Sequence, residues 1–211
     1  MMIFDIETAP IADAASYLPP QSAPANYKDP EKIAAYIAES HAAALDKAAL
    51  DPWLLRVVAI GMQHNADAPV AMLAPTIDDE RTILARFWRL ATAQFQSGGE
   101  LVGFNIIGFD LPALIQRSRL VGVKPELSTL KKYGQFGVID LVDRLTCGGI
   151  LPLRSLAWYC QRIGIDVPDE TSGKDMPGFV AAGNWPAVEA HVLADIRKTY
   201  ALAAWCGVAS F

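Results

Sequence analysis

The sequence predicts an α/β fold in which helices cover a mixed β-sheet. Short apolar runs bounded by turn residues, which are typical of buried strands, recur along the chain. Apolar residues spaced three to four positions apart, which are typical of amphipathic helices, lie between several of these runs. Strands come first and then alternate with helices, an order that suits one mixed sheet with helices packed on it.

The first half of the chain supplies three expected strands. Residues 2–6 form the first of them. Residues 9–30 are rich in proline, alanine and serine and are expected to be a long loop. Residues 30–50 begin with a proline followed by acids, which predicts one long helix or two short ones. Residues 55–63 and 69–74 are expected to form a pair of neighbouring strands.

The second half alternates helices and strands. A helix is expected to begin after Thr76 or Asp78, either of which can act as its N-cap, and to end at Ser97-Gly98-Gly99. The remaining expected elements are a strand at 101–105, a helix at 108–120, a strand ending at 138–141, and helices at 154–163 and 185–205.

The length and composition indicate one domain. A chain of 211 residues with 52% hydrophobic and 19% charged residues can bury a sizeable core, which excludes global disorder. We predict a single domain over residues 1–211, with residues 9–52 inserted between the first and second core strands.

The apolar runs and cysteines indicate a cytoplasmic protein with no membrane partner. No run approaches the roughly 20 apolar residues that span a bilayer. The start has no basic segment and carries Asp5, unlike a signal peptide. Cys147, Cys160 and Cys206 are far apart and form no Cys-x-x-Cys pair, so we expect three reduced thiols rather than a zinc or dithiol site.

The net charge of −5 argues against a large, non-specific surface for polyanions. A small nucleic-acid site stays possible, because metal-binding acids themselves lower the formal charge and bound cations restore a positive potential. Lys124, Lys131 and Lys132 form the local basic concentration, either as a solvated loop or as a patch that follows phosphates.

The most informative motif is Asp5-Ile6-Glu7 in the first expected strand. Carboxylates at i and i+2 of a strand point to the same face, where they repel each other. A hard cation between them would relieve this repulsion. The alternative is an edge strand with two solvated acids.

Two further segments carry acids. Asp110 follows the expected strand at 101–105, where a helix begins, and can be a metal ligand or an ordinary N-cap. His191 and Asp195 are i and i+4 of the late helix and share one face, either as part of a site or as a simple hydrogen-bonded pair.

Together these segments resemble the DEDD (DnaQ-like) superfamily of 3′–5′ exonucleases. The closest resemblance is to the predicted exonucleases related to the proofreading domain of family B DNA polymerases, which include phage and prophage members. The matching segments appear in the family's order at residues 4–8, 104–112, 139–141, 173–178 and 191–196. The resemblance implies a ribonuclease-H-like fold.

By this resemblance the catalytic, metal-binding acids are Asp5, Glu7, Asp110 and Asp195. Hydrolysis of a phosphodiester needs an activated water and a stabilised leaving oxygen, and two divalent cations about 4 Å apart provide both. Carboxylate oxygens suit Mg²⁺ or Mn²⁺.

Three residues are expected beside the terminal nucleotides, Asn105 and Phe109 by the resemblance and Thr8 because it follows Glu7. Thr8 would meet the 3′-terminal sugar, and Asn105 and Phe109 would lie near the last bases. Phe109 can stack on a base or simply pack in the core. Asp140 is expected to be a structural cap or an outer supporting group rather than a ligand.

His191 departs from the family's pattern. The tyrosine subclass carries Tyr-x-x-x-Asp and the histidine subclass carries His with one more intervening residue, whereas this chain has the tyrosine spacing with a histidine. An imidazole pKa of about 6.5 suits a general base, so we expect His191 to be a catalytic residue that orients the attacking water or accepts its proton. The alternative is that it packs on the helix while the cations alone activate water.

These residues predict a metal-dependent 3′–5′ exonuclease that acts on single-stranded DNA. The alternatives are an exoribonuclease, a non-catalytic nucleic-acid-binding domain of the same fold and a small-molecule phosphatase. The expected partners are a nucleic acid 3′ end and a polymerase or a replication or repair complex acting in trans.

Overall fold

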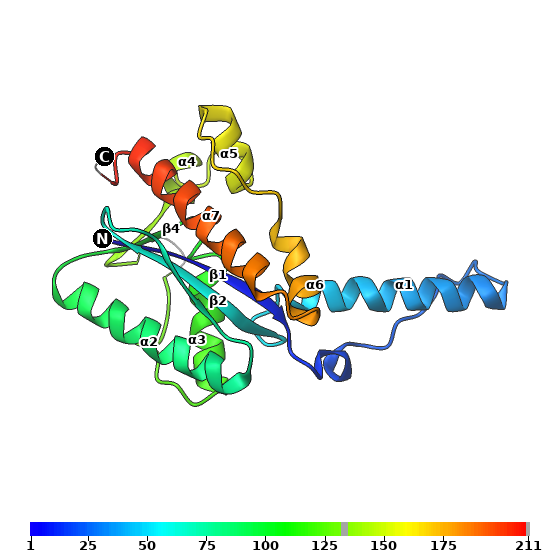
Figure 1. The fold of residues 1–211 in the computed structure, drawn as a ribbon. Helices are drawn as coiled ribbons and strands as arrows, with labels where there is room; N and C mark the ends of the chain where they lie inside the picture. Colours follow the sequence, from blue (N-terminus) through cyan, green and yellow to red (C-terminus); the bar gives the residue numbers. More distant parts are fainter. Residues whose placement is uncertain (132–134, 210–211) are drawn as a thin grey trace.

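The computed structural model describes residues 1–131 and 135–209. In these residues one five-stranded mixed sheet has the order β3-β2-β1-β4-β5 (Figure 1). The central strand β1 (Met2–Pro10) pairs antiparallel with β2 (Leu55–His64) and parallel with β4 (Leu101–Gly103). Outside them, β3 (Val70–Leu73) is antiparallel to β2 and β5 (Val138–Asp140) is parallel to β4. The predicted mixed sheet is confirmed.

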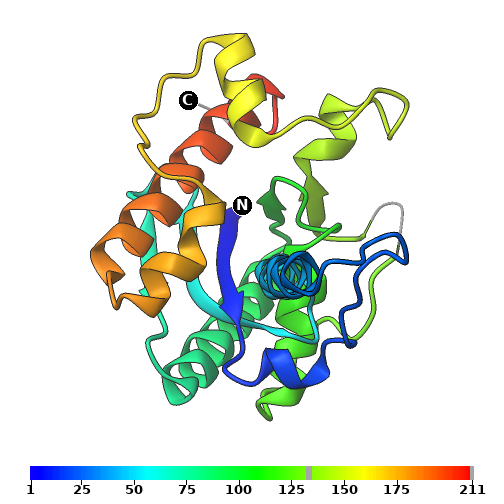
Figure 2. The same cartoon turned by 90° about the vertical axis from the view of Figure 1, so that its right-hand side faces the viewer.

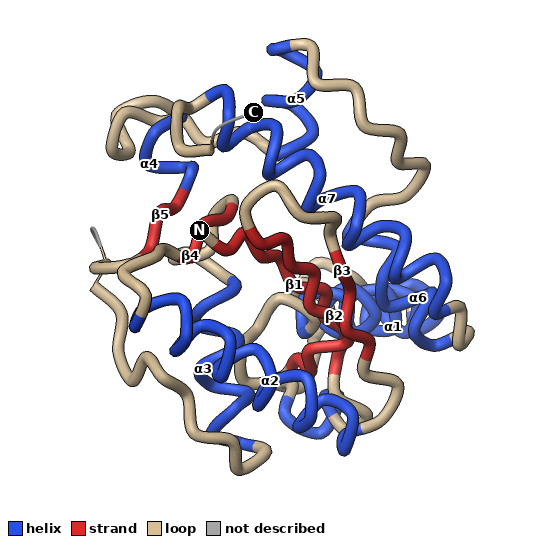
Figure 3. The backbone as a smooth tube through the Cα atoms, turned by 60° about the vertical axis from the view of Figure 1, so that its left-hand side comes forward, coloured by secondary structure: helices blue, strands red, loops and turns tan. Residues whose placement is uncertain are grey.

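Helices cover both faces of this sheet, as Figure 3 shows. One face carries α2 (Ile77–Gln96) and α3 (Asp110–Leu120), and the other carries α7 (Trp185–Trp205) with the short α6 (Met176–Ala181). The α5 helix (Leu156–Ile163) packs against α7, and α4 (Leu141–Leu145) follows β5 directly.

The alternation of side chains along β1 separates these two layers. Met2, Phe4 and Ile6 are buried in the cluster under α2 and α3, whereas Ile3 is buried in the cluster under α7. Asp5 has the parity of Ile3, and so has Glu7, because the register shift between β1 and β2 comes after Glu7. The two acids therefore lie on the α7 face of the central strand, and the alternative of a solvated edge strand is wrong.

The expected insertion carries two helical elements. A 3-10 turn, η1 (Ala14–Tyr17), precedes α1 (Pro30–Ala48), which is one helix capped by the Asp29 side chain on Glu31 N. Figures 1 and 2 show α1 projecting from the body of the molecule, with its axis toward the viewer in Figure 2. Residues 9–10, expected in the loop, belong to β1 instead, because pairing with β2 continues to Pro10 and Leu55.

The other predicted elements are found within a few residues of their expected bounds. Thr76 is the N-cap of α2, in a reciprocal hydrogen-bonded arrangement with Asp79. Helix α3 begins at Asp110 rather than at residue 108, and its N-cap is Phe109, so the interpretation of Asp110 as an N-cap is wrong. Sequence analysis missed α4, α6 and the second 3-10 turn, η2 (Gly173–Asp175).

The remaining predictions concern the surface and the cysteines. None of the helices described by the structure is both long and apolar enough to cross a membrane. Cys147, Cys160 and Cys206 are all unpaired thiols, as expected. Lys132, one of the three lysines of the basic concentration, lies outside the described residues.

Candidate active site

Two acids reach the candidate site from the central strand. Glu7 is buried, with 6% of its surface exposed, and Asp5 is half-buried. Both lie on β1, the central strand of the sheet, beyond the two residues that pair with β4, so at Asp5 and Glu7 the paired neighbour is β2. Successive side chains of a paired strand point to opposite faces, so the pairing of β1 with β2 sets where these carboxylates point.

Asp110 reaches the site from the start of α3. Its Oδ1 accepts a hydrogen bond of 3.2 Å from the backbone N–H of Ile6, the residue between the two β1 acids. The carboxylate is 4% exposed, so it is nearly removed from water. This contact ties the first turn of α3 to β1 and explains why Asp110 is not free to cap its own helix.

Asp140 fixes the link between β4 and α3. Its side chain accepts hydrogen bonds from the backbone N–H groups of Asn105 (2.8 Å), Ile107 (2.9 Å) and Val142 (3.0 Å). Asn105 adopts a left-handed backbone conformation, with φ of 60°, which turns the chain sharply toward Asp110. Asp140 is therefore a cap of α4 and a support of the link, as the sequence predicted.

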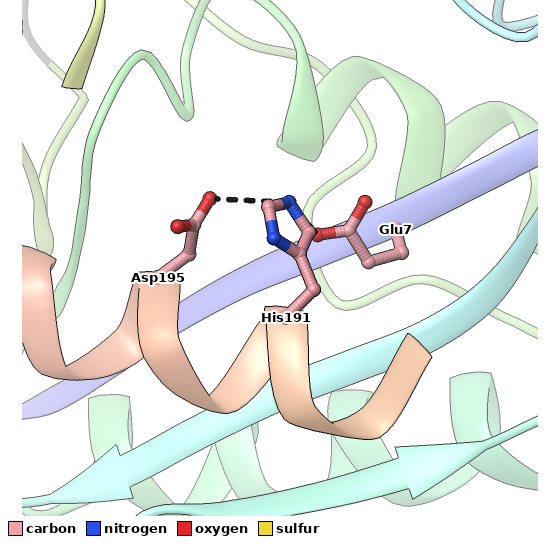
Figure 4. Close-up of side chains that lie close together, drawn as sticks. All are labelled: Glu7, His191 and Asp195. Atoms are coloured by element: carbon pink, nitrogen blue, oxygen red, sulfur yellow. Dashed lines mark ion pairs between the residues drawn. The ribbon is translucent and has the colours of Figure 1, made fainter. Parts of the chain in front are cut away.

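Helix α7 brings the third segment onto the same face. His191 is buried, and its Nε2 lies 3.5 Å from Glu7 Oε1 and 3.8 Å from Asp195 Oδ2. Figure 4 shows the imidazole between the two carboxylates, with Glu7 on β1 and Asp195 one turn along α7. One ligand atom from each of the three residues lies within 4.8 Å of the others, a spacing that can hold a metal ion.

Three further residues complete the site, and sequence analysis missed all of them. Asp169 Oδ2 lies 3.0 Å from His191 Nδ1, and the Thr171 hydroxyl oxygen is also 3.0 Å from that nitrogen. Lys198 Nζ donates to Asp169 Oδ2 at 2.5 Å and to Asp195 Oδ1 at 2.8 Å. Lys198 could have been predicted from the sequence, because it is three residues after Asp195 and shares its helix face. Asp169 and Thr171 lie in a loop with no period to reveal them.

The acids perturb one another strongly. Burial, followed by the charges of Asp110, Asp195 and Glu7, raises the pKa of Asp5 well above its usual range. Burial, followed by the charges of Asp195 and Asp110, does the same to the pKa of Glu7. Burial raises the pKa of Asp110 to about 8, although hydrogen bonds from backbone N–H groups act in the opposite direction. The ionised forms of these groups are therefore costly in the protein alone.

This donor set fits a divalent cation. Carboxylate oxygens are the ligands that Mg²⁺ and Mn²⁺ prefer. A cation among Asp5, Glu7, Asp110 and Asp195 would stabilise the ionised carboxylates that burial and mutual repulsion disfavour. The Lys198 ammonium supplies part of this compensation, at Asp195 and at Asp169.

The three residues expected to contact substrate lie in three different environments. The Thr8 hydroxyl donates its hydrogen to Ala49 O at 2.7 Å, so it already has a partner within the protein. Phe109 is half-buried and packs against the apolar cluster under α2 and α3, as its core-packing alternative predicted. Asn105 lines a groove of about 360 Å³ together with Pro112, Lys131, Asp140 and Asp143.

A solved structure resembles this fold over nearly the whole chain. The family B DNA polymerase from the hyperthermophilic archaeon Pyrobaculum calidifontis superposes with a TM-score of 0.64 at 17% identity, covering 97% of this chain. The chain spans 24% of that polymerase, and at this identity the likeness shows the fold alone. The ribonuclease-H-like α/β fold is confirmed, and no curated protein matches the sequence.

The sequence itself matches a family model over residues 50–209, described as a predicted 3′–5′ exonuclease related to the exonuclease domain of PolB. The matched range contains Asp110, His191 and Asp195 but not Asp5 or Glu7, whose place in the site rests on the geometry of β1. Because the match extends over well more than half of the chain, the chain belongs to this family of predicted 3′–5′ exonucleases.

Proposed function

We propose that this protein hydrolyses nucleic acid from its 3′ end with two divalent cations, Mg²⁺ or Mn²⁺. The observation that carries the proposal is the convergence of Glu7 from β1 with His191 and Asp195 from α7, at the two ends of the sequence. The charge of Asp110 adds to burial in raising the pKa of Asp5, which supports a shared cationic partner for the two acids.

Each group has a role in this proposal. Asp5, Glu7, Asp110 and Asp195 would hold the cations. When bound, the cations supply Lewis-acid stabilisation of the phosphate and lower the pKa of water. His191 orients the attacking water and takes its proton at Nε2, which faces Glu7 and Asp195. The buried position of His191 holds the ring in one place and limits competing contact with bulk water.

The proposed substrate is the 3′ end of single-stranded DNA, on the basis of the family relationship. RNA is the second candidate, because groups that act on phosphate and sugar do not by themselves read the bases. The groove beside Asn105 leads past Lys131, a cation that can follow a phosphate backbone. We propose that the enzyme works in the cytoplasm and that a polymerase or a repair complex supplies its substrate in trans.

The test is digestion of 5′-labelled DNA and RNA oligonucleotides in Mg²⁺, Mn²⁺ and EDTA, with Asp5→Ala as the inactive control. Stepwise shortening from the 3′ end that stops in EDTA and in Asp5→Ala supports the proposal, and the better substrate decides between DNA and RNA.

Two results would reject it. Binding without cleavage in both metals would indicate a non-catalytic domain. Turnover of a simple phosphomonoester with no shortening of the oligonucleotides would indicate a phosphatase.

A further inference from the structure

The carboxylate of Asp169 accepts three hydrogen bonds and lies against a fourth polar atom, His191 Nδ1. Oδ1 accepts from the Thr171 backbone N–H at 3.1 Å and from the Thr171 hydroxyl at 2.8 Å. Oδ2 faces Lys198 Nζ at 2.5 Å and His191 Nδ1 at 3.0 Å. The side chain is only 6% exposed, so these contacts replace most of its hydration.

These contacts determine which nitrogen of neutral His191 carries the hydrogen. Nδ1 has two neighbours, the Asp169 carboxylate and the Thr171 hydroxyl oxygen. A hydroxyl has one hydrogen, and that of Thr171 is given to Asp169 Oδ1. Toward Nδ1, Thr171 can therefore only accept, as can the carboxylate. Both acceptors at Nδ1 lie at 3.0 Å, closer than the carboxylate oxygens that face Nε2 at 3.5 and 3.8 Å, so neutral His191 carries its hydrogen on Nδ1 and its lone pair on Nε2.

We propose that Asp169 is a positioning residue that holds His191 in the Nδ1–H tautomer and so directs the Nε2 lone pair at the water attacking the phosphodiester. The direction follows from the distances, because Nε2 is the nitrogen that faces Glu7 and Asp195. The same division of labour, with one group orienting the imidazole and the imidazole accepting the proton, operates in hydrolytic triads. This inference rests on the proposed nuclease function.

Lys198 explains why an ionised carboxylate can persist in this position. Burial opposes the charge of Asp169, but hydrogen bonds from Lys198, Thr171 and His191 outweigh it and lower the pKa of Asp169 to about 2. Lys198 also bridges to Asp195, which connects the Asp169 loop to the cation-binding face of α7. An amide at position 169 would turn an NH₂ group toward one of these donor pairs, so asparagine cannot reproduce the arrangement.

The test reads the tautomer directly. Long-range ¹H–¹⁵N spectra distinguish protonated from unprotonated imidazole nitrogens, and the chain has three histidines, so His191→Gln assigns the signal of interest. Spectra are recorded at alkaline pH, where imidazoles are neutral. We expect Nδ1–H in the wild type and loss of that tautomer in Asp169→Asn. Glu170→Gln, the same charge change at the exposed neighbouring residue, should keep the wild-type spectrum.

The kinetic arm uses the same variants on the oligonucleotide that the wild type degrades best. Asp169→Asn should lower kcat by about 10²-fold with little change in KM, as expected when general-base catalysis is lost. Thr171→Val should keep the tautomer, because Asp169 alone suffices to accept from Nδ1. Thermal melting and Mn²⁺ binding verify that each variant is folded.

Two outcomes overturn the inference: Nε2–H in the wild type, or Asp169→Asn with both the spectrum and the turnover of the wild type. Should Asp169→Asn fail to fold, the wild-type spectrum still decides. A wild type with Nδ1–H but no nuclease activity would reject the proposed function and leave the tautomer assignment standing.

Discussion

The two faces of the sheet treat buried carboxylates in opposite ways. Under α2 and α3, Glu80 is fully buried and receives two hydrogen bonds from Arg117, at 2.8 and 2.7 Å, with a third from the Val57 backbone N–H at 2.8 Å. Under α7, Asp5 and Glu7 lack a bidentate partner of this kind among the described residues, and their pKa values are raised.

This difference in pairing distinguishes a buried carboxylate with a structural role from buried carboxylates with a functional role. A buried charge whose role is structural is paired by the protein itself, and such a pair contributes to stability only as long as both partners remain. Crowded acids that the protein leaves undercompensated cost stability, and this cost is expected where a bound cation is part of the activity. The comparison predicts opposite outcomes when the same chemical change is made on the two faces.

The largest expected effect is the loss of activity on the α7 face. Glu7→Gln should lower kcat by about 10³-fold or more, because weaker cation binding removes several kcal/mol of transition-state stabilisation. The same variant should melt at a higher temperature than the wild type in EDTA, because one repelling charge is gone. Single-turnover digestion and thermal melting measure the two effects, and a lower melting temperature in EDTA would break the comparison.

The matched change on the other face is Glu80→Gln. It leaves Arg117 as a buried charge without its carboxylate and should destabilise the fold by about 3–5 kcal/mol. Because the Glu80 carboxylate is bonded to Arg117 and the Val57 backbone and to none of the cation-binding acids, the folded fraction should retain the wild-type kcat. Urea unfolding gives the free energy. A loss below about 1 kcal/mol would mean that the Arg117 pair is not structural.

The next effect concerns the base. His191→Ala should lower kcat by about 10²-fold, the usual contribution of a general base, while cation binding changes less. His41→Ala in α1 is the matched control and should behave as the wild type. Unchanged turnover of His191→Ala would show that the ring only fills space between Glu7 and Asp195.

The smallest effect is a pH dependence of stability. The pKa of Asp110 is raised to about 8, above that of an unfolded aspartate, so its contribution to stability is fully present below about pH 4 and is lost as pH rises through 8. The shifts of Asp5 and Glu7 have the same direction. In EDTA the melting temperature should therefore fall between pH 5 and 8, and saturating Mn²⁺ should reverse most of that fall.

Asp110→Asn is the control for this pH dependence, and in EDTA its melting temperature should change less between pH 5 and 8 than that of the wild type. Parallel melting curves with and without Mn²⁺ across this pH range would contradict the account of undercompensated acids.

Features of this protein that depend on short-range spacing could be predicted from the sequence. The i, i+2 spacing of Asp5 and Glu7 predicted a shared face, and the i, i+4 spacing of His191 and Asp195 predicted a shared turn, because strand and helix periods are local properties. The order of strands and helices indicated a mixed sheet for the same reason.

Contacts between segments that are distant in the chain could not be predicted from the sequence. Asp169 meets His191 only because the loop before η2 lies against α7, and no period or spacing encodes that approach. The extension of β1 to Pro10 depends on pairing with Leu55, and the Thr8 hydroxyl meets Ala49 O only in the folded chain. For Asp110, local rules allowed the alternative of an N-cap, whereas in the fold Phe109 is the N-cap and Asp110 Oδ1 accepts from Ile6 N.

The central claim is that the acids of β1, α3 and α7 gather around a pair of divalent cations. Anomalous diffraction from crystals soaked in Mn²⁺ tests it most directly. We expect two manganese peaks coordinated by Asp5, Glu7, Asp110 and Asp195. Carboxylates that diverge from one another, with no anomalous peak among them at saturating Mn²⁺, would contradict the claim.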